Sequence, residues 1–199
     1  MLGGDTTHGE ITVVSITLIG HSKSRRDLIT RSGATAGDLI FVTGALGAST
    51  AGLKLFQNKI PGFAFEKKKH LNPTARIGVS SKIAKFATAM EDVSDGLASE
   101  VRNICLASRT GAVIFAEKIP IRKTTIEAAE RLGDDARDYA NFGGEDFELV
   151  FTVNEKDESR AKKFGTLVGV VTRDSGKVCL SENGRKRQLT RFGFDHFLA

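Results

Sequence analysis

The chain has 199 residues, of which 40% are hydrophobic and 27% are charged, and its formal net charge at pH 7 is +5. This length is sufficient for one substantial hydrophobic core, with or without a small appended segment. A membrane-spanning helix needs about 20 apolar residues, whereas the longest apolar run, at residues 11–20, is shorter and contains threonine and serine. The composition therefore predicts a soluble globular protein that does not contact a membrane.

The N-terminal sequence MLGGDTTHGE lacks the basic region and apolar core of a secretion signal. Cys105 and Cys179 lie far apart and outside any CxxC spacing. Both observations predict a cytoplasmic location. Basic residues fall in short clusters such as 67–69 and 185–187, and the chain has no tryptophan and one tyrosine. A single-strand stacking platform needs interleaved aromatics, so we predict a solvated basic surface and no nucleic-acid partner.

The hydrophobic pattern predicts alternating strands and helices. Residues 11–20 alternate β-branched and smaller side chains, as a strand does. Residues 38–44 form a short apolar run that ends at a glycine, and residues 47–58 then have helical spacing. Residues 61–73 mix helix breakers with a lysine run and predict a loop or lid, and residues 74–89 predict a further helix.

The same alternation continues through the second half of the chain. Helical spacing after Asp95 predicts a helix that stops at Gly111. The later predicted elements are strands at 112–119 and 147–153, helices at 124–132, 134–142 and 155–164, and final strands at 166–173 and 177–181. A short polar turn, RDSGK, predicts antiparallel pairing of the last two strands. The predicted fold class is α+β or mixed α/β, with helices layered on a sheet.

Acidic and hydroxyl side chains crowd the start of the helix that follows residue 95, in the sequence EDVSDG. Magnesium sites are built from one or two carboxylates plus substrate phosphates. Asp92 and Asp95 can face the same way, and Ser94 adds a hydrogen-bond donor near the positive end of the helix dipole. The simpler alternative, which the spacing alone favours, is that Asp92 or Ser94 caps the helix.

Three other stretches could bind a ligand, and each has a simpler structural explanation. NFGGEDFELVF at 141–151 sets two glycines before three acids, either beside a ligand or as a turn with exposed acids. GGDTT at 3–7 holds Asp5 beside hydroxyl groups, either as a hard-oxygen site or as a turn. RSGATAGD at 31–38 holds Arg31 beside small residues, which suits a phosphate or a linker. No Ser/His/Asp or Cys/His grouping predicts an acyl-enzyme.

Taken together and in order, these stretches resemble the thiamine-monophosphate kinase family, which belongs to the superfamily of aminoimidazole ribonucleotide synthetase. The resemblance rests on GGDTT, RSGATAGDLIFVTG, LNPTARI, DVSDGLASEV, NFGGEDFELVFT and the closing GFDHF. It implies the C-terminal α+β domain of that superfamily's fold, and ATP-dependent phosphorylation of thiamine monophosphate to thiamine diphosphate with Mg²⁺.

The resemblance also implies roles for individual residues. It places ATP at Gly4, Asp5, Arg31 and Ser94, magnesium at Asp5, Asp92 and Asp95, and thiamine monophosphate at Glu145 and Phe194. Phe194 stands where the family has an aromatic residue against the substrate ring, and Glu91 keeps only a surface role. None of these residues is implied to act as an acid, base or nucleophile.

Family members carry a further stretch of chain ahead of GGDTT, with more aspartates of the metal cluster. The resemblance therefore implies that residues 1–30 are the last strand of an N-terminal ATP- and metal-binding domain, and that residues 31–199 are the C-terminal domain. We expect activity to need the N-terminal half, and association as a homodimer or with that half. Two alternatives are a non-catalytic domain that binds nucleotide or thiamine phosphate, and another ATP-using enzyme of the superfamily.

Overall fold

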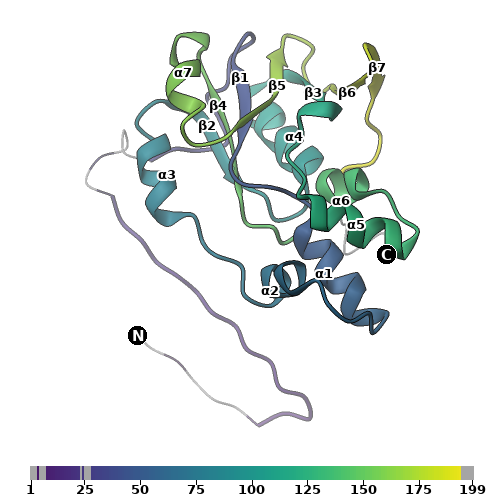
Figure 1. The fold of residues 1–199 in the computed structure, drawn as a ribbon. Coiled ribbons are helices and arrows are strands. Elements are labelled where there is room, and N and C mark those ends of the chain that lie inside the picture. Colours follow the sequence, from purple (N-terminus) through teal and green to yellow (C-terminus); the bar gives the residue numbers. More distant parts are fainter. Residues whose placement is uncertain (1–3, 5–7, 23, 25–27, 194–199) are drawn as a thin grey trace.

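A seven-stranded sheet runs through the computed structural model, which describes residues 4, 8–22, 24 and 28–193 (Figure 1). Its strand order is β2-β4-β1-β5-β3-β6-β7, and every neighbouring pair is antiparallel except β3 and β6. The strands are β1 (Leu39–Val42), β2 (Ala87–Asp92), β3 (Gly111–Phe115), β4 (Leu149–Val153), β5 (Thr166–Thr172), β6 (Val178–Glu182) and β7 (Arg185–Gln188).

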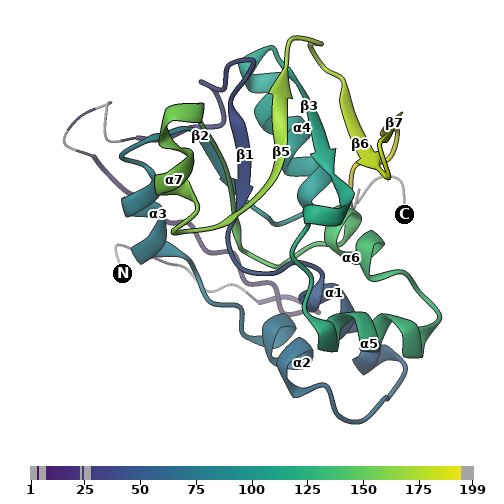
Figure 2. The same cartoon turned by 45° about the horizontal axis from the view of Figure 1, so that its top comes forward.

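Helices connect and cover these strands. They are α1 (Ala48–Gln57), α2 (Ala64–Leu71), α3 (Ile77–Ile83), α4 (Leu97–Ser108), α5 (Lys123–Leu132), α6 (Ala136–Phe142) and α7 (Glu158–Ala161), with 3₁₀ turns at η2 (Ala116–Lys118) and η3 (Glu155–Asp157). Figures 1 and 2 show α1, α2 and α5 gathered beyond one end of the strands. The predicted α+β class, with helices layered on a sheet, is confirmed.

Alternating side chains of the central strands build two cores, one on each face of the sheet. Ile40 and Val42 belong to the core that α4 covers, whereas Phe41 between them belongs to the core that α3 and α7 cover. Phe41 stacks on Phe151 of β4 with ring centroids 5.7 Å apart. Because successive strand residues face opposite sides, helices on both faces explain why β4 is buried throughout and β1 is buried from Ile40 to Val42.

The direction of the strands determines which loops meet. β1 and β2 both pair antiparallel with β4, so both end where β4 begins. The loop into α1, the loop from β2 to α4 and the loop from α6 to β4 therefore converge at one end of the sheet. These loops include two of the motifs that the sequence singled out, DVSDGL and GGEDFEL.

The strand predicted at residues 11–20 is wrong. This segment has no strand hydrogen bonding in the structure, and its apolar side chains are exposed, Leu18 to 93%. Figure 1 shows it running apart from the sheet. An alternating pattern becomes a strand only when a partner accepts its backbone hydrogen bonds, and the described residues supply none here. The assignment of residues 1–30 to a separate domain stays a prediction.

Two predictions between residues 61 and 89 are also wrong. The expected loop at 61–73 contains α2, because the run from Ala64 to Leu71 consists of good helix formers behind the breaker Pro61-Gly62. Within the helix expected at 74–89, only the residues of α3 form an α-helix. Residues 87–92 instead pair with β4 as a strand. Tertiary pairing overrides local helical spacing at this point.

The predicted hairpin at the C-terminal end is wrong as well. β5 and β6 do not pair with each other, because β3 lies between them and pairs with both. The antiparallel partner of β6 is β7, which the sequence pattern did not predict because Arg185, Lys186 and Arg187 are exposed and polar.

Among the described residues, no helix is long and apolar enough to cross a membrane.

Candidate functional site

Backbone hydrogen bonds join the two motif loops. Beyond the last strand pair of β2 and β4, the N–H of Val93 donates to the carbonyl of Glu148 at 2.7 Å, and the N–H of Phe147 donates to the carbonyl of Val93 at 2.8 Å. The N–H of Glu145 then donates to the carbonyl of Ser94 at 2.7 Å. The relative position of the two motifs is thus fixed by the main chain.

Glycines permit this close approach. A Cβ on Gly144 would lie 2.4 Å from the carbonyl oxygen of Ser94, and a Cβ on Gly96 would lie 2.6 Å from that of Asn141. Gly96 also has φ of +108°, a conformation that L side chains rarely adopt. The glycines of both motifs are therefore needed for loop packing, whether or not a ligand binds.

Glu100, in the first turn of α4, fixes the backbone of the Ser94–Asp95 segment. Its buried carboxylate accepts hydrogen bonds from the backbone N–H of Ser94 at 3.0 Å and of Asp95 at 2.7 Å. Burial raises the pKa of Glu100, although these two hydrogen bonds act in the opposite direction. The N-cap of α4 is Gly96, and no side chain caps it, so the alternative in which Asp92 or Ser94 caps this helix is wrong.

A cleft of about 390 Å³ opens between the two loops, the start of α1 and the end of α2. Its polar lining includes Ser49, His70, Ser94, Asp95, Glu145 and Arg191. Ser94, Asp95 and Glu145, which the sequence analysis assigned to ligands, are therefore brought together. The cleft presents carboxylates, hydroxyls and one arginine to a common space, which suits a ligand that carries both phosphate and cationic groups.

Ser49, His70 and Glu145 form a grouping that the sequence did not suggest. His70 Nδ1 lies 3.1 Å from Ser49 Oγ and 3.6 Å from Glu145 Oε2. In a Ser-His-acid triad the serine and the acid contact opposite ring nitrogens, whereas here both face the same nitrogen. This geometry is that of a positioned side chain, and it does not make Ser49 a nucleophile.

The side chains of Asp146 and Glu148 are buried, and their hydrogen bonds hold the segments that form the walls of the cleft. Asp146 accepts hydrogen bonds from the backbone N–H groups of Gly47, at 2.5 Å, and of Ser49, at 3.0 Å, at the start of α1. Burial raises its pKa to about 6 against these hydrogen bonds. Both acids are at most 1% exposed, so the alternative of a turn with exposed acids is wrong for them.

Glu148 holds the chain on either side of the α2–α3 connection. It contacts Lys69 at 2.8 Å and Arg76 at 2.7 and 2.5 Å, and accepts the Thr43 hydroxyl at 2.7 Å. Burial raises the pKa of Glu148, but the hydrogen bonds from Arg76, Lys69 and Thr43 outweigh it and hold the pKa below its usual range. Lys69 is only 10% exposed, so the predicted solvated lysine cluster is wrong at this position.

Arg31 lies outside the cleft and pairs with Glu91, at 2.6 Å between Arg31 Nη2 and Glu91 Oε1. Glu91 is 8% exposed, so its expected surface role is wrong. Burial and the neighbouring Glu100 carboxyl raise the pKa of Glu91 to about 7, and Arg31 opposes this shift. Sequence alone could not show this, because Glu91 faces α4 only once β2 has joined the sheet.

Of the three aspartates assigned to magnesium, Asp92 and Asp95 are described, and they differ in position. Asp95 lines the cleft, whereas Asp92 is exposed at the end of β2 and does not line it. In the described part of the chain, no group of three or more His, Cys, Asp or Glu side chains could hold a metal ion. Magnesium sites use one or two carboxylates with phosphates and water, which is fewer protein ligands than such a group contains. The magnesium role of Asp92 and Asp95 stays a prediction.

Three assigned residues remain, Gly4, Asp5 and Phe194. Gly4 is described and exposed, with no atom within 4 Å of the position a Cβ would take. Asp5 and Phe194 lie outside the described residues, so their assigned contacts stay predictions. The residues that sequence reasoning missed are Ser49, His70, Glu100 and Arg191. The sequence offers one signal for the neighbourhood of His70, because the motif LNPTARI directly follows it and contains Arg76.

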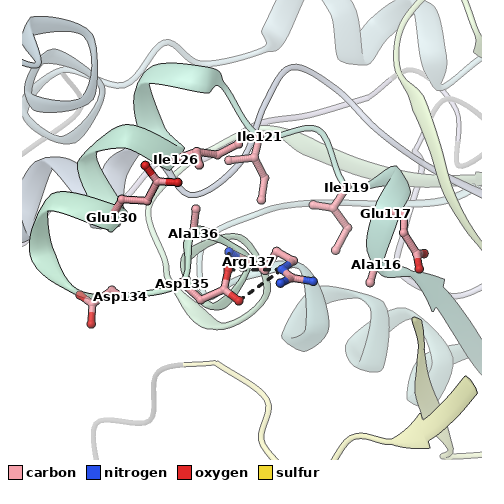
Figure 3. Close-up of a pocket in the computed structure, with 10 residues that line it drawn as sticks. All are labelled: Ala116, Glu117, Ile119, Ile121, Ile126, Glu130, Asp134, Asp135, Ala136 and Arg137. Atoms are coloured by element: carbon pink, nitrogen blue, oxygen red, sulfur yellow. Dashed lines mark hydrogen bonds and ion pairs between the residues drawn. The ribbon is translucent and has the colours of Figure 1, made fainter. Parts of the chain in front are cut away.

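A second cavity, of about 490 Å³, lies between η2, α5 and α6 (Figure 3). Isoleucines such as Ile119 and Ile126 form its apolar part, and acids such as Glu130 surround it. Figure 3 shows Arg137 directed at Asp135, with 3.2 Å between Arg137 Nε and Asp135 Oδ2. None of the residues assigned from the sequence lines this cavity, so the cleft between the motif loops is the candidate site.

Comparison with known proteins gives a family. The family model described as "AIR synthase related protein, C-terminal domain" matches residues 35–178. Thiamine-monophosphate kinases of Buchnera aphidicola subsp. Acyrthosiphon pisum and of Escherichia coli K12 are 36% and 34% identical over 99% of the chain. The chain spans 64% and 63% of the lengths of these two relatives.

Solved structures agree with this assignment. "AaThiL complexed with AMPPCP and TMP" has a TM-score of 0.75 and 34% identity, over 85% of this chain and 54% of that one. Thiamine-monophosphate kinase from Stenotrophomonas maltophilia K279a has a TM-score of 0.72 and 28% identity, over 82% and 55%. The expected resemblance to thiamine-monophosphate kinases is thus confirmed. The chain belongs to the family of AIR synthase related proteins, and residues 35–178 match the C-terminal domain of that family.

Proposed function

We propose that this chain serves the ATP-dependent phosphorylation of thiamine monophosphate to thiamine diphosphate, and that the cleft between the motif loops binds the reacting phosphates. The observation that carries this proposal is the backbone pairing of Ser94 with Glu145, which sets a residue assigned to ATP against a residue assigned to thiamine monophosphate. A neighbour with 34% identity that holds both AMPPCP and TMP supports it.

The charges of the cleft fit such a ligand. Phosphoryl transfer depends on positioning and on electrostatic stabilisation. Arg191 supplies a cation, and it already stacks over the ring of Phe142 with its guanidinium carbon 5.0 Å from the centroid. Glu145 supplies a carboxylate for the cationic thiazolium part of the substrate. The Ser94 hydroxyl offers a donor for a phosphate oxygen.

Magnesium belongs to the same proposal. Asp92 and Asp95 would hold it together with phosphate oxygens, and the bound ion would neutralise the negative charge of the phosphates that are brought together. The chain's own contribution is positional, because Glu100 fixes the backbone of Ser94 and Asp95 before any ligand arrives. No covalent enzyme intermediate is required when one phosphate attacks another directly.

The contacts outside the cleft are part of the proposal on resemblance alone. Gly4, Asp5 and Arg31 would serve the nucleotide, and Phe194 would pack against the ring of thiamine monophosphate. We also propose that turnover needs an N-terminal half, supplied by the same or another polypeptide. The active protein would be a homodimer or would pair with that half. It would work in the cytoplasm.

Calorimetry with thiamine monophosphate and with Mg²⁺-ATP tests binding, and a coupled assay of ADP release tests turnover. The assay is run on this chain alone and with the N-terminal portion of the Buchnera relative. Asp95→Asn should weaken binding of Mg²⁺-ATP and leave the circular dichroism spectrum unchanged, and Glu127→Gln on the exposed face of α5 is the matched control. If the wild-type chain binds neither ligand in either setting, the proposed function is wrong.

A second candidate is a domain that binds nucleotide or thiamine phosphate without turnover. It is favoured by the position of Asp92, which is exposed and does not line the cleft with Asp95. Binding of both ligands without ADP release, even with the N-terminal portion present, would support this candidate over the kinase.

A further inference from the structure

We propose that His70 is a positioning residue, which holds the Glu145 carboxylate in the cleft through its Nδ1 nitrogen while Ser49 fixes the imidazole ring. The consequence for thiamine monophosphate rests on the proposed function, whereas the contact itself can be tested without a ligand. The carrying observation is the placement of Ser49 Oγ and Glu145 Oε2 at 3.1 and 3.6 Å from the same ring nitrogen.

The three side chains differ in how firmly they are held. Ser49 is 1% exposed and the His70 side chain is 18% exposed, whereas the Glu145 side chain is 60% exposed. Glu145 also has φ of +65°, in the left-handed region that non-glycine residues rarely adopt. The hydrogen bond to Ser94 fixes the backbone of Glu145. Among the described residues, its carboxylate makes one polar side-chain contact, with His70.

His70 is rigid because α2 is anchored on three sides. A Cβ on Gly52 of α1 would lie 3.1 Å from the Cβ of His70 and 2.2 Å from the carbonyl oxygen of Glu66, so the two helices pack without a gap. The buried Glu66 carboxylate accepts the hydroxyls of Thr124, at 2.6 Å, and Thr125, at 3.0 Å, on α5.

The third anchor is the residue before His70. Lys69 reaches the buried Glu148 at 2.8 Å, and Glu148 belongs to the same motif as Glu145. This motif therefore has two roles. Glu145 lines the cleft, and Glu148 anchors the end of α2 that carries His70. A residue anchored in this way can orient an exposed carboxylate with little loss of its own conformational freedom.

The charge of Glu145 selects the hydrogen-bonding role of His70. A neutral imidazole carries one proton, on Nδ1 or on Nε2. A carboxylate near Nδ1 favours the form in which Nδ1 carries the proton and donates it. In that form Nδ1–H donates to Ser49 Oγ at 3.1 Å, and its partial positive charge attracts Glu145 Oε2, which at 3.6 Å lies just beyond hydrogen-bond distance.

Substitutions that move the nitrogen test this role. In His70→Asn the side-chain amide nitrogen can take the place of Nδ1, whereas in His70→Gln it takes that of Nε2. We expect His70→Asn to keep the calorimetric Kd for thiamine monophosphate within about threefold. We expect His70→Gln and His70→Ala to weaken it about tenfold, through loss of the electrostatic contact that orients Glu145. His21→Asn, on an exposed histidine, is the control.

The coupling to Glu145 is tested in the same series. In a Glu145→Gln background, His70→Ala should add little further loss of affinity, since the carboxylate that it positions is gone. Equal losses for His70→Asn and His70→Gln, or a full loss from His70→Ala in the Glu145→Gln background, would overturn the inference.

A measurement without ligand separates this inference from the proposed function. Nitrogen-15 spectra of the imidazole should show a proton on His70 Nδ1 in the wild-type chain, and a changed Nδ1 resonance in Glu145→Gln and Ser49→Ala but not in Glu127→Gln. An unchanged resonance in Glu145→Gln overturns the inference even if thiamine monophosphate binds. A changed resonance in a chain that binds neither thiamine monophosphate nor Mg²⁺-ATP, alone or with the N-terminal portion, supports the contact and contradicts the proposed function.

Discussion

The backbone N–H of Glu145 donates to the carbonyl of Ser94 at 2.7 Å, and Gly144 packs its α-carbon against the same carbonyl. The distance between the two motif loops is thus set by main-chain contact at this point. Any substitution that separates the loops should affect the ligands of both. The first prediction uses this relationship.

Gly144→Ala should weaken binding of both thiamine monophosphate and Mg²⁺-ATP, and should lower the free energy of unfolding by about 1–3 kcal/mol, as overpacking does. The added Cβ would lie 2.4 Å from the Ser94 carbonyl oxygen, which is backbone and cannot rotate away. Urea unfolding and calorimetry measure the two effects. Gly78→Ala, where no atom lies within 4 Å of the new Cβ, is the control and should be neutral or stabilising.

Glu100 should matter as an acceptor and much less as a charge. Burial raises its pKa, so the environment already disfavours the ionised form, while one oxygen accepts the N–H groups of both Ser94 and Asp95. We expect Glu100→Gln to cost less than about 1 kcal/mol of unfolding free energy and Glu100→Leu to cost about 2–5 kcal/mol, because Leu leaves two donors unpaired. Urea unfolding of the two variants checks the prediction, and similar costs would contradict it.

Glu148→Gln should be strongly destabilising, by about 3–5 kcal/mol at pH 7, because it leaves the nearly buried Lys69 beside Arg76 without a carboxylate. The double variant Glu148→Gln with Lys69→Met should recover part of this loss, since it removes the uncompensated charge. Equal stability of the single and double variants in urea unfolding would show that Lys69 is not coupled to Glu148.

The same carboxylate predicts a pH dependence with a definite sign. The pKa of Glu148 is lowered in the folded protein, so its contribution is fully present above the ordinary glutamate pKa of about 4.3 and is lost as the pH falls through the lower folded value. The difference in unfolding free energy between wild type and Glu148→Gln should therefore be constant near pH 6–7 and shrink in acid. Urea unfolding as a function of pH measures this, and a difference that grows in acid would contradict it.

Cys105 should be unreactive in the folded protein. It is 1% exposed, and burial raises its pKa to about 11, so little thiolate forms at neutral pH. Titration with a disulfide reagent should show slow reaction of Cys105 and faster reaction of the half-buried Cys179, with both fast in denaturant.

Ionisation of Cys105 also has a predictable effect on stability. Its folded pKa is raised above the unfolded value, so between about pH 9 and 11 only the unfolded state ionises, and its contribution to stability falls as the pH rises. Cys105→Ala should remove this alkaline decline, although it lowers stability at neutral pH by leaving a small cavity.

Local pattern was sufficient for the elements that have a strong period and clear ends. Residues 47–58, 97–108 and 124–132 are helices as predicted, and the strand predicted at 147–153 is present as β4. Ser94, Asp95 and Glu145, which the family resemblance assigned to ligands, all line the cleft, and their ligand roles stay predictions. Periodicity and motif spacing depend only on residues that are close together in the sequence, so they detect features of this local kind.

Tertiary structure alone decided which strands pair, which acids are buried and which side chains share the cleft. Residues 87–92 became a strand because β4 accepts their hydrogen bonds, and residues 11–20 did not because the described chain offers them no partner. Glu91 and Glu148 are buried because Arg31, Lys69 and Arg76 reach them from distant segments. His70 meets Glu145 for the same reason: both depend on contacts between residues far apart in the chain, which no local sequence pattern contains.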